Sequence, residues 1–411
     1  MTIDDTFPNW ANQTERTIPV SSLQTLVAFI CLASASFAAE RPNVLFIAID
    51  DLNHSVDVLG GHTMKERKDA EQWALVSLKG DQQLALYALD ETQGTLTLRS
   101  KTNTKGKPAS IAVAPNGHDL YVALHERNSL AAYRVEADAT LTFLNESPIG
   151  HAASYLQVHR NGRFLISSYY RGGKVALHSL RKDGTLVPEA LQLLDVDRQA
   201  HAAVWDHRGA HAFVPHTRPN TITQFRFESE RLIPSPAGQL QREANSGPRH
   251  LWFHPHCAVA YGSDEQGCSI TSYHFDPRKS TLRKAETHSS LPAEGYAGAK
   301  KSTSDIEVHP SGDHVYIANR GHNSIATFAI DPNDRTKLKR IGHAVTEAVP
   351  RSFNIAPNGK FLVAAGQQNG KLAVFRIQEN GKLERTSTLD AGKSPAWVHF
   401  VVQPAKKATS E

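Results

Sequence analysis

Short stretches of alternating apolar and polar residues recur along most of the chain, and each stretch reverses direction at a tight turn. The clearest copies span residues 110–124, 304–320 and 351–367, and each contains a Pro-x-Gly turn. Weaker copies complete a series of six turn positions, 45 to 55 residues apart: Gly117, Gly162, Gly209, Cys257, Gly312 and Gly359. Alternation with a period of two predicts β-strands, and a repeat of this length built from short strands is typical of a β-propeller blade.

Two half-repeats flank the six complete copies. Residues 73–90 predict two strands separated by Lys79-Gly-Asp, and residues 394–402 predict the innermost strand that this first half lacks. Joining the two halves closes the ring and removes the free sheet edges that would otherwise promote aggregation. We therefore predict an all-β fold, a seven-bladed β-propeller over residues 73–402 that is closed by strands from both ends of the repeat region.

The phase of the repeat predicts which side chains meet at one mouth of the axial channel. In each repeat the innermost strand runs into the turn and the next strand runs back, so residues equally far before and after the turn lie at the same end of the blade. Eight residues before the turns stand Ala109, Ser154, His201, Arg249, Ser304 and Arg351. Eight residues after them stand His125, Tyr170, Thr217, Glu265, Arg320 and Gln367, and Lys79 has the same phase in the first blade.

The charged members of these rings favour a functional site over a merely solvated channel mouth. They are His201, Arg249, Glu265, Arg320 and Arg351. Convergent charges are unfavourable without a ligand, and paired arginines suit phosphate or carboxylate groups. A glutamate among arginines stays ionised, and a histidine can carry protons near neutral pH.

Other polar residues of the rings carry less information. Each of Lys79, Thr217 and Gln367, considered alone, indicates only a solvated channel mouth. For His159, His254 and His309 we predict a role in the turns.

Composition narrows the classes of partner. The 411 residues are 40% hydrophobic, which is ample for a large core, and the net charge of +4 comes without a long basic run, so we expect no nucleic-acid partner. No apolar stretch approaches membrane-spanning length, and we expect a monomer that is not inserted in a membrane. For Cys257 and Cys268 we favour two ordinary cysteines over a disulfide, and their spacing does not suit zinc.

Residues 1–72 precede the repeat region and do not show its strand pattern. Residues 1–39 predict a signal or leader, because an apolar run at 26–32 precedes small residues typical of a cleavage site. Residues 40–62 resemble the first strand of sulfatases, in which Asp50 and Asp51 would bind metal, but no sulfatase nucleophile motif follows. We interpret residues 40–72 as a non-functional fragment and linker. A genuine signal predicts a periplasmic or secreted protein, and translation from Met64 predicts a cytoplasmic one. We predict a disordered tail at 403–411.

The repeat region resembles the propeller lactonase family, which includes bacterial 6-phosphogluconolactonase and the fungal carboxy-cis,cis-muconate cyclase. The resemblance rests on Gly247-Pro-Arg-His, on Ala-Ala-Gly-Gln ending at Gln367, and on residues 305–320 and 394–398. The chain departs from the family at residues 291–303. The resemblance implies four catalytic residues: His201, Arg249, Glu265 and Arg320. We assign substrate binding to a second set: Arg351, His125, Tyr170, Gln367, Lys79, His250 and Asp305.

We therefore expect a carboxylic-ester hydrolase that opens a sugar lactone, with 6-phosphoglucono-δ-lactone as the favoured substrate and 6-phosphogluconate as the product, as in the pentose phosphate pathway. The reaction needs a base for water and donors for the developing oxyanion, but no metal or other cofactor. Either Glu265 or His201 would be the base. The alternatives are a lactonising cyclase acting on a muconate-like dicarboxylate, with the arginines binding its carboxylates, and a non-catalytic binding scaffold.

Overall fold

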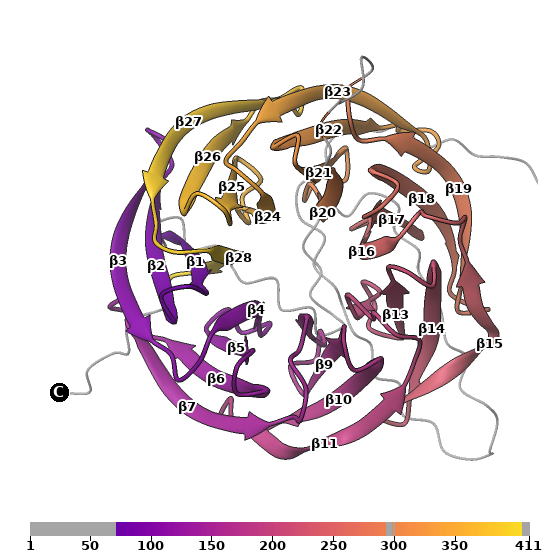
Figure 1. The fold of residues 1–411 in the computed structure, drawn as a ribbon, viewed down its shortest axis with the longest axis horizontal. Coiled ribbons are helices and arrows are strands. Elements are labelled where there is room, and N and C mark those ends of the chain that lie inside the picture. Colours follow the sequence, from indigo (N-terminus) through magenta and orange to yellow (C-terminus); the bar gives the residue numbers. More distant parts are fainter. Residues whose placement is uncertain (1–70, 293–297, 299–300, 405–411) are drawn as a thin grey trace, which may run out of the picture. The chain divides into compact units, whose positions relative to one another are not determined.

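The structure is a computed structural model that describes residues 71–292, 298 and 301–404. The described residues form 28 strands in seven four-stranded antiparallel sheets, which stand as blades around a common centre (Figure 1). This confirms the predicted all-β, seven-bladed propeller. The predicted signal, Asp50 and Asp51, and residues 405–411 of the predicted tail lie outside the described residues. No helix in the described ranges is long and apolar enough to cross a membrane.

The four strands of each blade follow one another from the centre of the ring to its rim. The closing blade contains β28 (Pro395–Val402), β1 (Gln72–Leu78), β2 (Gln83–Asp90) and β3 (Thr95–Asn103). The next two contain β4 (Pro108–Val113), β5 (Asp119–Leu124), β6 (Ser129–Val135) and β7 (Leu141–Pro148), then β8 (Tyr155–Val158), β9 (Phe164–Tyr169), β10 (Lys174–Leu180) and β11 (Leu186–Asp195). The fourth and fifth contain β12 (Val204–Trp205), β13 (His211–His216), β14 (Thr221–Glu228) and β15 (Arg231–Gln241), then β16 (Pro248–Phe253), β17 (Val259–Asp264), β18 (Ser269–Asp276) and β19 (Thr281–Ser289). The last two contain β20 (Ser302–Val308), β21 (His314–Arg320), β22 (Ser324–Ile330) and β23 (Leu338–Val345), then β24 (Pro350–Ile355), β25 (Phe361–Gly366), β26 (Lys371–Ile377) and β27 (Leu383–Asp390).

The ring is closed by strands from the two ends of the described chain. Strand β28 pairs with β1 in antiparallel register, from Gln72 opposite Val402 to Leu78 opposite Pro395. One blade therefore combines residues more than 300 positions apart in sequence, as the two half-repeats predicted. Figure 1 shows β28 at the centre of the ring and β3 at its rim.

The hydrophobic core lies between neighbouring blades. Every residue of β9 and β25 is buried, whereas every residue of the outermost strand β27 is either partly buried or exposed. One core cluster joins Ala74 and Tyr87 of the closing blade to Phe361 and Val363 of β25. Because each sheet buries both faces against its neighbours, burial of apolar area holds the blades in the ring.

Three histidines connect the turns of neighbouring blades. The Nε2 atoms of His159, His254 and His309 donate hydrogen bonds to the carbonyl oxygens of Gly209, Gly312 and Gly359, at 2.8, 2.9 and 2.8 Å respectively. These bonds agree with the turn role predicted for the histidines. Those three turn glycines have positive φ, but Cys257 does not, and its turn is closed instead by a bond from the Val259 amide to the Cys257 carbonyl. Cys257 and Cys268 are both free thiols.

The contact between His159 and Gly209 can be tested by substitution. Gly209 has a φ of +72°, and a Cβ atom added there would overlap with His159 Nε2. The equivalent turn glycine of the preceding blade, Gly162, has a φ of +69° and only Pro115 Cδ nearby, at 3.8 Å. Both alanine variants carry a backbone penalty of about 1–2 kcal/mol, and Gly209→Ala should lose about 1–3 kcal/mol more. Calorimetric melting of both variants measures this difference. Equal melting temperatures would show that the histidine contact does not restrict this turn.

Candidate active site

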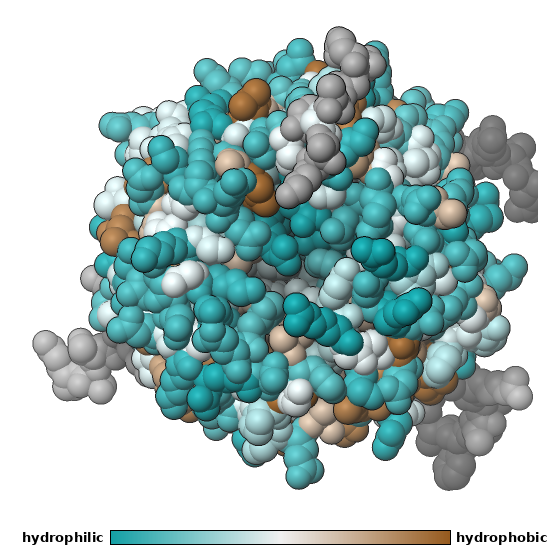
Figure 2. All heavy atoms as spheres, in the orientation of Figure 1, coloured by the Kyte–Doolittle hydropathy of each residue, from teal (hydrophilic) through white to brown (hydrophobic). Residues whose placement is uncertain are grey.

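One face of the propeller contains a cavity of about 940 Å³ at the centre of the ring. Figure 2 shows a hollow in the middle of one face with mostly hydrophilic side chains around it. All seven blades, or the segments leading into them, contribute to its lining: Lys79, Lys107, His125, Glu126, Asn128, residues 150–152, Ser154, residues 170–172, His201, Glu265, Arg320 and Arg351. These positions lie at or shortly before the start of an innermost strand, or at or shortly after the end of a second strand. The cavity is therefore built from one end of every blade.

The structure brings most of the predicted site residues together at this cavity. Those that line it are Lys79, His125, Tyr170, His201, Glu265, Arg320 and Arg351. Three others, Arg249, His250 and Asp305, are buried and connect with the lining through hydrogen bonds and ion pairs. Gln367 follows β25 as expected, but its side chain is not part of the cavity lining.

A chain of charged and polar groups connects Arg320 with Asp305. The Arg320 Nη2 atom donates to Glu265 Oε1 at 2.8 Å and to the Thr303 carbonyl oxygen at 2.8 Å. The other carboxylate oxygen of Glu265 lies 3.6 Å from Arg249 Nε, which is an ion pair rather than a hydrogen bond.

Beneath this pair, Arg249 Nη1 donates to His250 Nε2 at 3.2 Å. A guanidinium can only donate, so His250 must carry its proton on Nδ1, which donates to Asp305 Oδ1 at 2.8 Å.

The two carboxylates of this network are ionised. Burial alone would raise the pKa of Glu265, but the charges of Arg249 and Arg320 outweigh burial and hold that pKa below its usual value. The pKa of Asp305 is lowered in the same way, because its hydrogen bond from His250 and nearby positive charge outweigh burial.

Arg249 is only 1% exposed, and burial, followed by repulsion from Arg320, lowers its pKa to about 9. Arg249 therefore stays charged at neutral pH, and Glu265 is the carboxylate that pairs with it.

His201 is a neutral imidazole at the edge of this network. Burial, followed by the charges of Arg249 and other nearby cations, holds its pKa well below the usual value of 6.5. Its ring packs against Tyr170, with centroids 5.5 Å apart, and against His250 at 5.1 Å. Its Nδ1 atom is buried without a hydrogen-bond partner among the described residues. A neutral imidazole that lines the cavity can accept a proton.

The cavity carries an excess of positive charge. Five cations line it, Lys79, Lys107, Arg171, Arg320 and Arg351, against only two carboxylates, Glu126 and Glu265. Burial, then repulsion from Arg320, lowers the pKa of Arg351, whose guanidinium makes no hydrogen bond or ion pair with the described residues. Like charges held this close favour an anionic ligand. The described residues contain no cluster of three or more His, Cys, Asp or Glu that could hold a metal ion.

The prediction from repeat phase missed four charged or ionisable lining residues. Glu126 and Arg171 directly follow the predicted positions His125 and Tyr170, while Lys107 and His151 lie in the segments that lead into β4 and β8. A window extending one residue beyond the counted positions, which stand eight residues after each turn, would have included Glu126 and Arg171. Lys107 and His151 precede their strands by irregular lengths of chain, so no phase rule reaches them.

Comparisons with known proteins agree with this architecture. Residues 67–400 match the family model described as "Lactonase, 7-bladed beta-propeller". A 6-phosphogluconolactonase of Yersinia pestis is 30% identical over 330 residues, which is 80% of this chain and 97% of the relative. A solved putative 6-phosphogluconolactonase from Bacteroides uniformis is 26% identical, with a TM-score of 0.73 over 81% of this chain and 100% of that chain. The periplasmic gluconolactonase of Pseudomonas aeruginosa shares the fold at 23% identity, with a TM-score of 0.74 over 82% of this chain and 99% of that chain.

The pairing of Glu265 with the buried Arg249 predicts a stability effect. The variant Glu265→Gln removes the one carboxylate that forms an ion pair with Arg249 among the described residues, and it should lower the free energy of unfolding by about 3 kcal/mol. The matched variant is Glu126→Gln, because Glu126 lines the same cavity but pairs with Lys107 at an exposed position. It should lose no more than about 1 kcal/mol. Urea denaturation of both variants measures the difference. Equal, small losses would contradict the pairing of Arg249 with Glu265.

Proposed function

The chain belongs to the seven-bladed β-propeller lactonase family, and we propose that it hydrolyses the ester bond of a sugar lactone, with 6-phosphoglucono-δ-lactone as its substrate. The observation that carries the proposal is the neutral histidine His201, which lines a cavity with excess positive charge. Close to it lie Arg249 and Arg320, which both form ion pairs with Glu265. Similarity to the 6-phosphogluconolactonase of Yersinia pestis supports the choice of substrate. The product would be 6-phosphogluconate.

In the proposed mechanism, Arg320 binds the lactone carbonyl oxygen. Its guanidinium lines the cavity and is held at 2.8 Å by both Glu265 and the Thr303 carbonyl. Because these bonds exist before the substrate arrives, the positive charge is already in place when the carbonyl oxygen becomes negative. Arg249 contributes a second positive charge from its buried position, and the Glu265–Arg249 pair keeps Arg320 oriented.

We assign the base to His201 rather than to Glu265. Both carboxylate oxygens of Glu265 face guanidinium groups, and its pKa is lowered, so it is a poor proton acceptor. His201 takes a proton from water as the water oxygen bonds to the lactone carbonyl carbon. It then returns that proton to the ring oxygen as the ester C–O bond breaks, which yields the open hydroxy acid.

Substrate binding itself would make His201 a stronger base. In the free protein, burial and then the charge of Arg249 lower its pKa, with further contributions from His250, Arg351 and Arg320. A bound anion offsets the positive charges and raises the pKa of His201 towards the working pH. The excess positive charge would therefore attract the substrate and delay protonation of the base until the substrate is bound.

Replacing the base tests the assignment. The variant His201→Gln should reduce kcat/KM for freshly generated 6-phosphoglucono-δ-lactone, measured above the spontaneous rate, by about 10²–10⁴-fold. The control is His256→Gln, because His256 is an exposed residue in the β16–β17 turn and does not line the cavity. It should keep full activity. Unchanged activity in a folded His201→Gln protein would move the base to Glu265.

The lowered pKa of His201 also predicts the pH profile. A base must be unprotonated, and a lowered pKa keeps His201 unprotonated to more acidic pH. The acid limb of kcat/KM, which reports the free protein, should therefore lie below pH 6.5. The acid limb of kcat, which reports the substrate complex, should lie at higher pH. A kcat/KM limb above pH 6.5 would contradict this environment for His201.

A genuine signal at residues 1–39 would place the reaction in the periplasm or outside the cell, which is the location named for the solved periplasmic gluconolactonase. Translation from Met64 would instead place the reaction in the cytoplasm, where phosphorylated sugar lactones are ordinary metabolites.

A further inference from the structure

The cavity lining divides into two halves with different chemistry. Three consecutive blades, β12–β15, β16–β19 and β20–β23, supply His201 and Arg320, which act on the substrate in the proposed mechanism, and Glu265, which orients Arg320. The closing blade and the next two supply a second set that the mechanism does not use: Lys79, Lys107, His125, His151 and Arg171. Arg351, from the remaining blade β24–β27, stands between the two halves and acts electrostatically on both Glu265 and Lys79.

Lys79 is a cation held in place by a neutral partner. Its Nζ atom donates to His125 Nδ1 at 3.1 Å, and His125 Nε2 donates to the Ala153 carbonyl oxygen at 2.8 Å. Burial, then repulsion from Lys79, lowers the pKa of His125 to about 4, so this imidazole is uncharged at neutral pH. Lys79 forms no ion pair with any described carboxylate, although burial and repulsion from Arg351 lower its pKa. It is therefore fixed in position but not neutralised.

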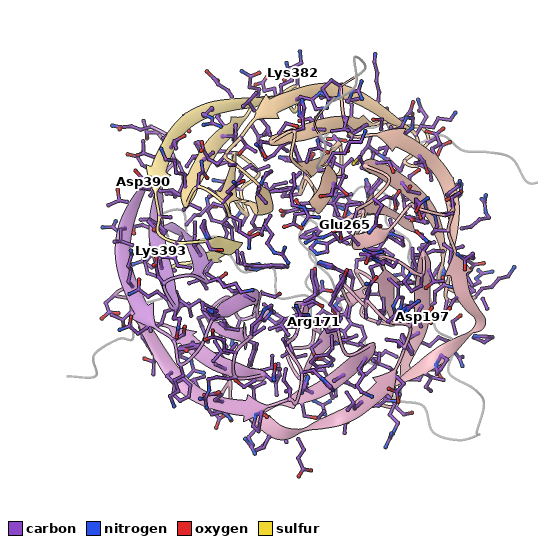
Figure 3. The ribbon with its side chains drawn as sticks, in the orientation of Figure 1. Arg171, Asp197, Glu265, Lys382, Asp390 and Lys393 are labelled. Atoms are coloured by element: carbon purple, nitrogen blue, oxygen red, sulfur yellow. The ribbon has the colours of Figure 1, made fainter. Side chains whose placement is uncertain are left out.

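Arg171 is the second cation without a counter-charge. It follows Tyr170 in the turn between β9 and β10, and it makes no hydrogen bond or ion pair with other described residues. Figure 3 shows Arg171 and Glu265 near the centre of the ring, on different blades. Lys107 differs, because it pairs with Glu126. Lys79 and Arg171 are thus the two uncompensated cations of this half.

We propose that Lys79 and Arg171, assisted by Arg351, form a subsite for the phosphoryl group of a phosphorylated sugar lactone, whose ester then lies towards His201 and Arg320. This inference rests on the proposed function and adds the residues that select a phosphorylated substrate. A phosphoryl group carries a charge of about −1.5 to −2 at neutral pH, which matches two or three cations, and a guanidinium can bind two of its oxygens at once. An unphosphorylated lactone leaves both cations without a partner and is disfavoured.

The variants Arg171→Ala and Lys79→Met test the subsite with two substrates, 6-phosphoglucono-δ-lactone and glucono-δ-lactone. Each variant should lower kcat/KM for the phosphorylated lactone by at least about tenfold, as expected for a hydrogen bond to a charged group. Its kcat/KM for glucono-δ-lactone should stay within about twofold, since that substrate makes no ion pair there. The matched control is Arg218→Ala: Arg218 has the same position in the next blade but does not line the cavity. Equal losses on both substrates would overturn the subsite.

Binding of the products separates this inference from the proposed function. Calorimetry should show that the full chain prefers 6-phosphogluconate to gluconate, and that Arg171→Ala and Lys79→Met each weaken this preference at least about tenfold. A chain inactive on both lactones that keeps this preference would refute the proposed hydrolysis and support the subsite. Equal binding of the two acids by the unaltered chain, or an unchanged preference in both variants, would refute the subsite.

Discussion

The pairing of β28 with β1 is the constraint on which the rest of the molecule depends. Seven blades converge on one cavity only if the ring is closed, and closure requires the strand at 395–402 to pair with the strand at 72–78. The closing blade supplies Lys79, and the blade before it supplies Arg351, so both come to the mouth through this pairing. The catalytic and phosphoryl halves that we propose are therefore positioned by a single antiparallel register.

Within the ring, the proposed chemistry depends on a difference between the two halves of the cavity: the charged groups of one half form ion pairs, and two cations of the other half do not. Glu265 pairs with Arg320 and with the buried Arg249, and Asp305 orients His250 beneath them, so this half is a fixed and internally balanced network. Lys79 and Arg171, on the other half, have no carboxylate partner among the described residues. A fixed network suits the developing charge of a transition state, whereas unpaired cations suit an anion that arrives with the substrate. The same cavity can thus separate catalysis from substrate selection.

Much of this arrangement could be predicted from sequence, because the repeat links position in the chain to position in the blade. The turns at Gly117, Gly312 and Gly359 set the phase, and counting outwards from the turn positions reached His201, Glu265 and Arg320. The hydrogen bonds from Arg249 to His250 and from His250 to Asp305 depend on side-chain direction, which phase does not contain. Arg171 lies in a turn, one position beyond the ring that was counted. Gln367 has the right phase, yet its side chain does not line the cavity.

The central claim is that this cavity accelerates opening of a phosphorylated sugar lactone through the Arg249–Glu265–Arg320 network. The most direct measurement is the hydrolysis rate of freshly generated 6-phosphoglucono-δ-lactone with the full chain, compared with the spontaneous rate and with the double variant Arg249→Ala/Glu265→Gln. Circular dichroism would verify that the variant is folded. The account predicts acceleration by the unaltered chain and its loss in the variant. Equal acceleration by both proteins, or none by the folded unaltered chain, would contradict it.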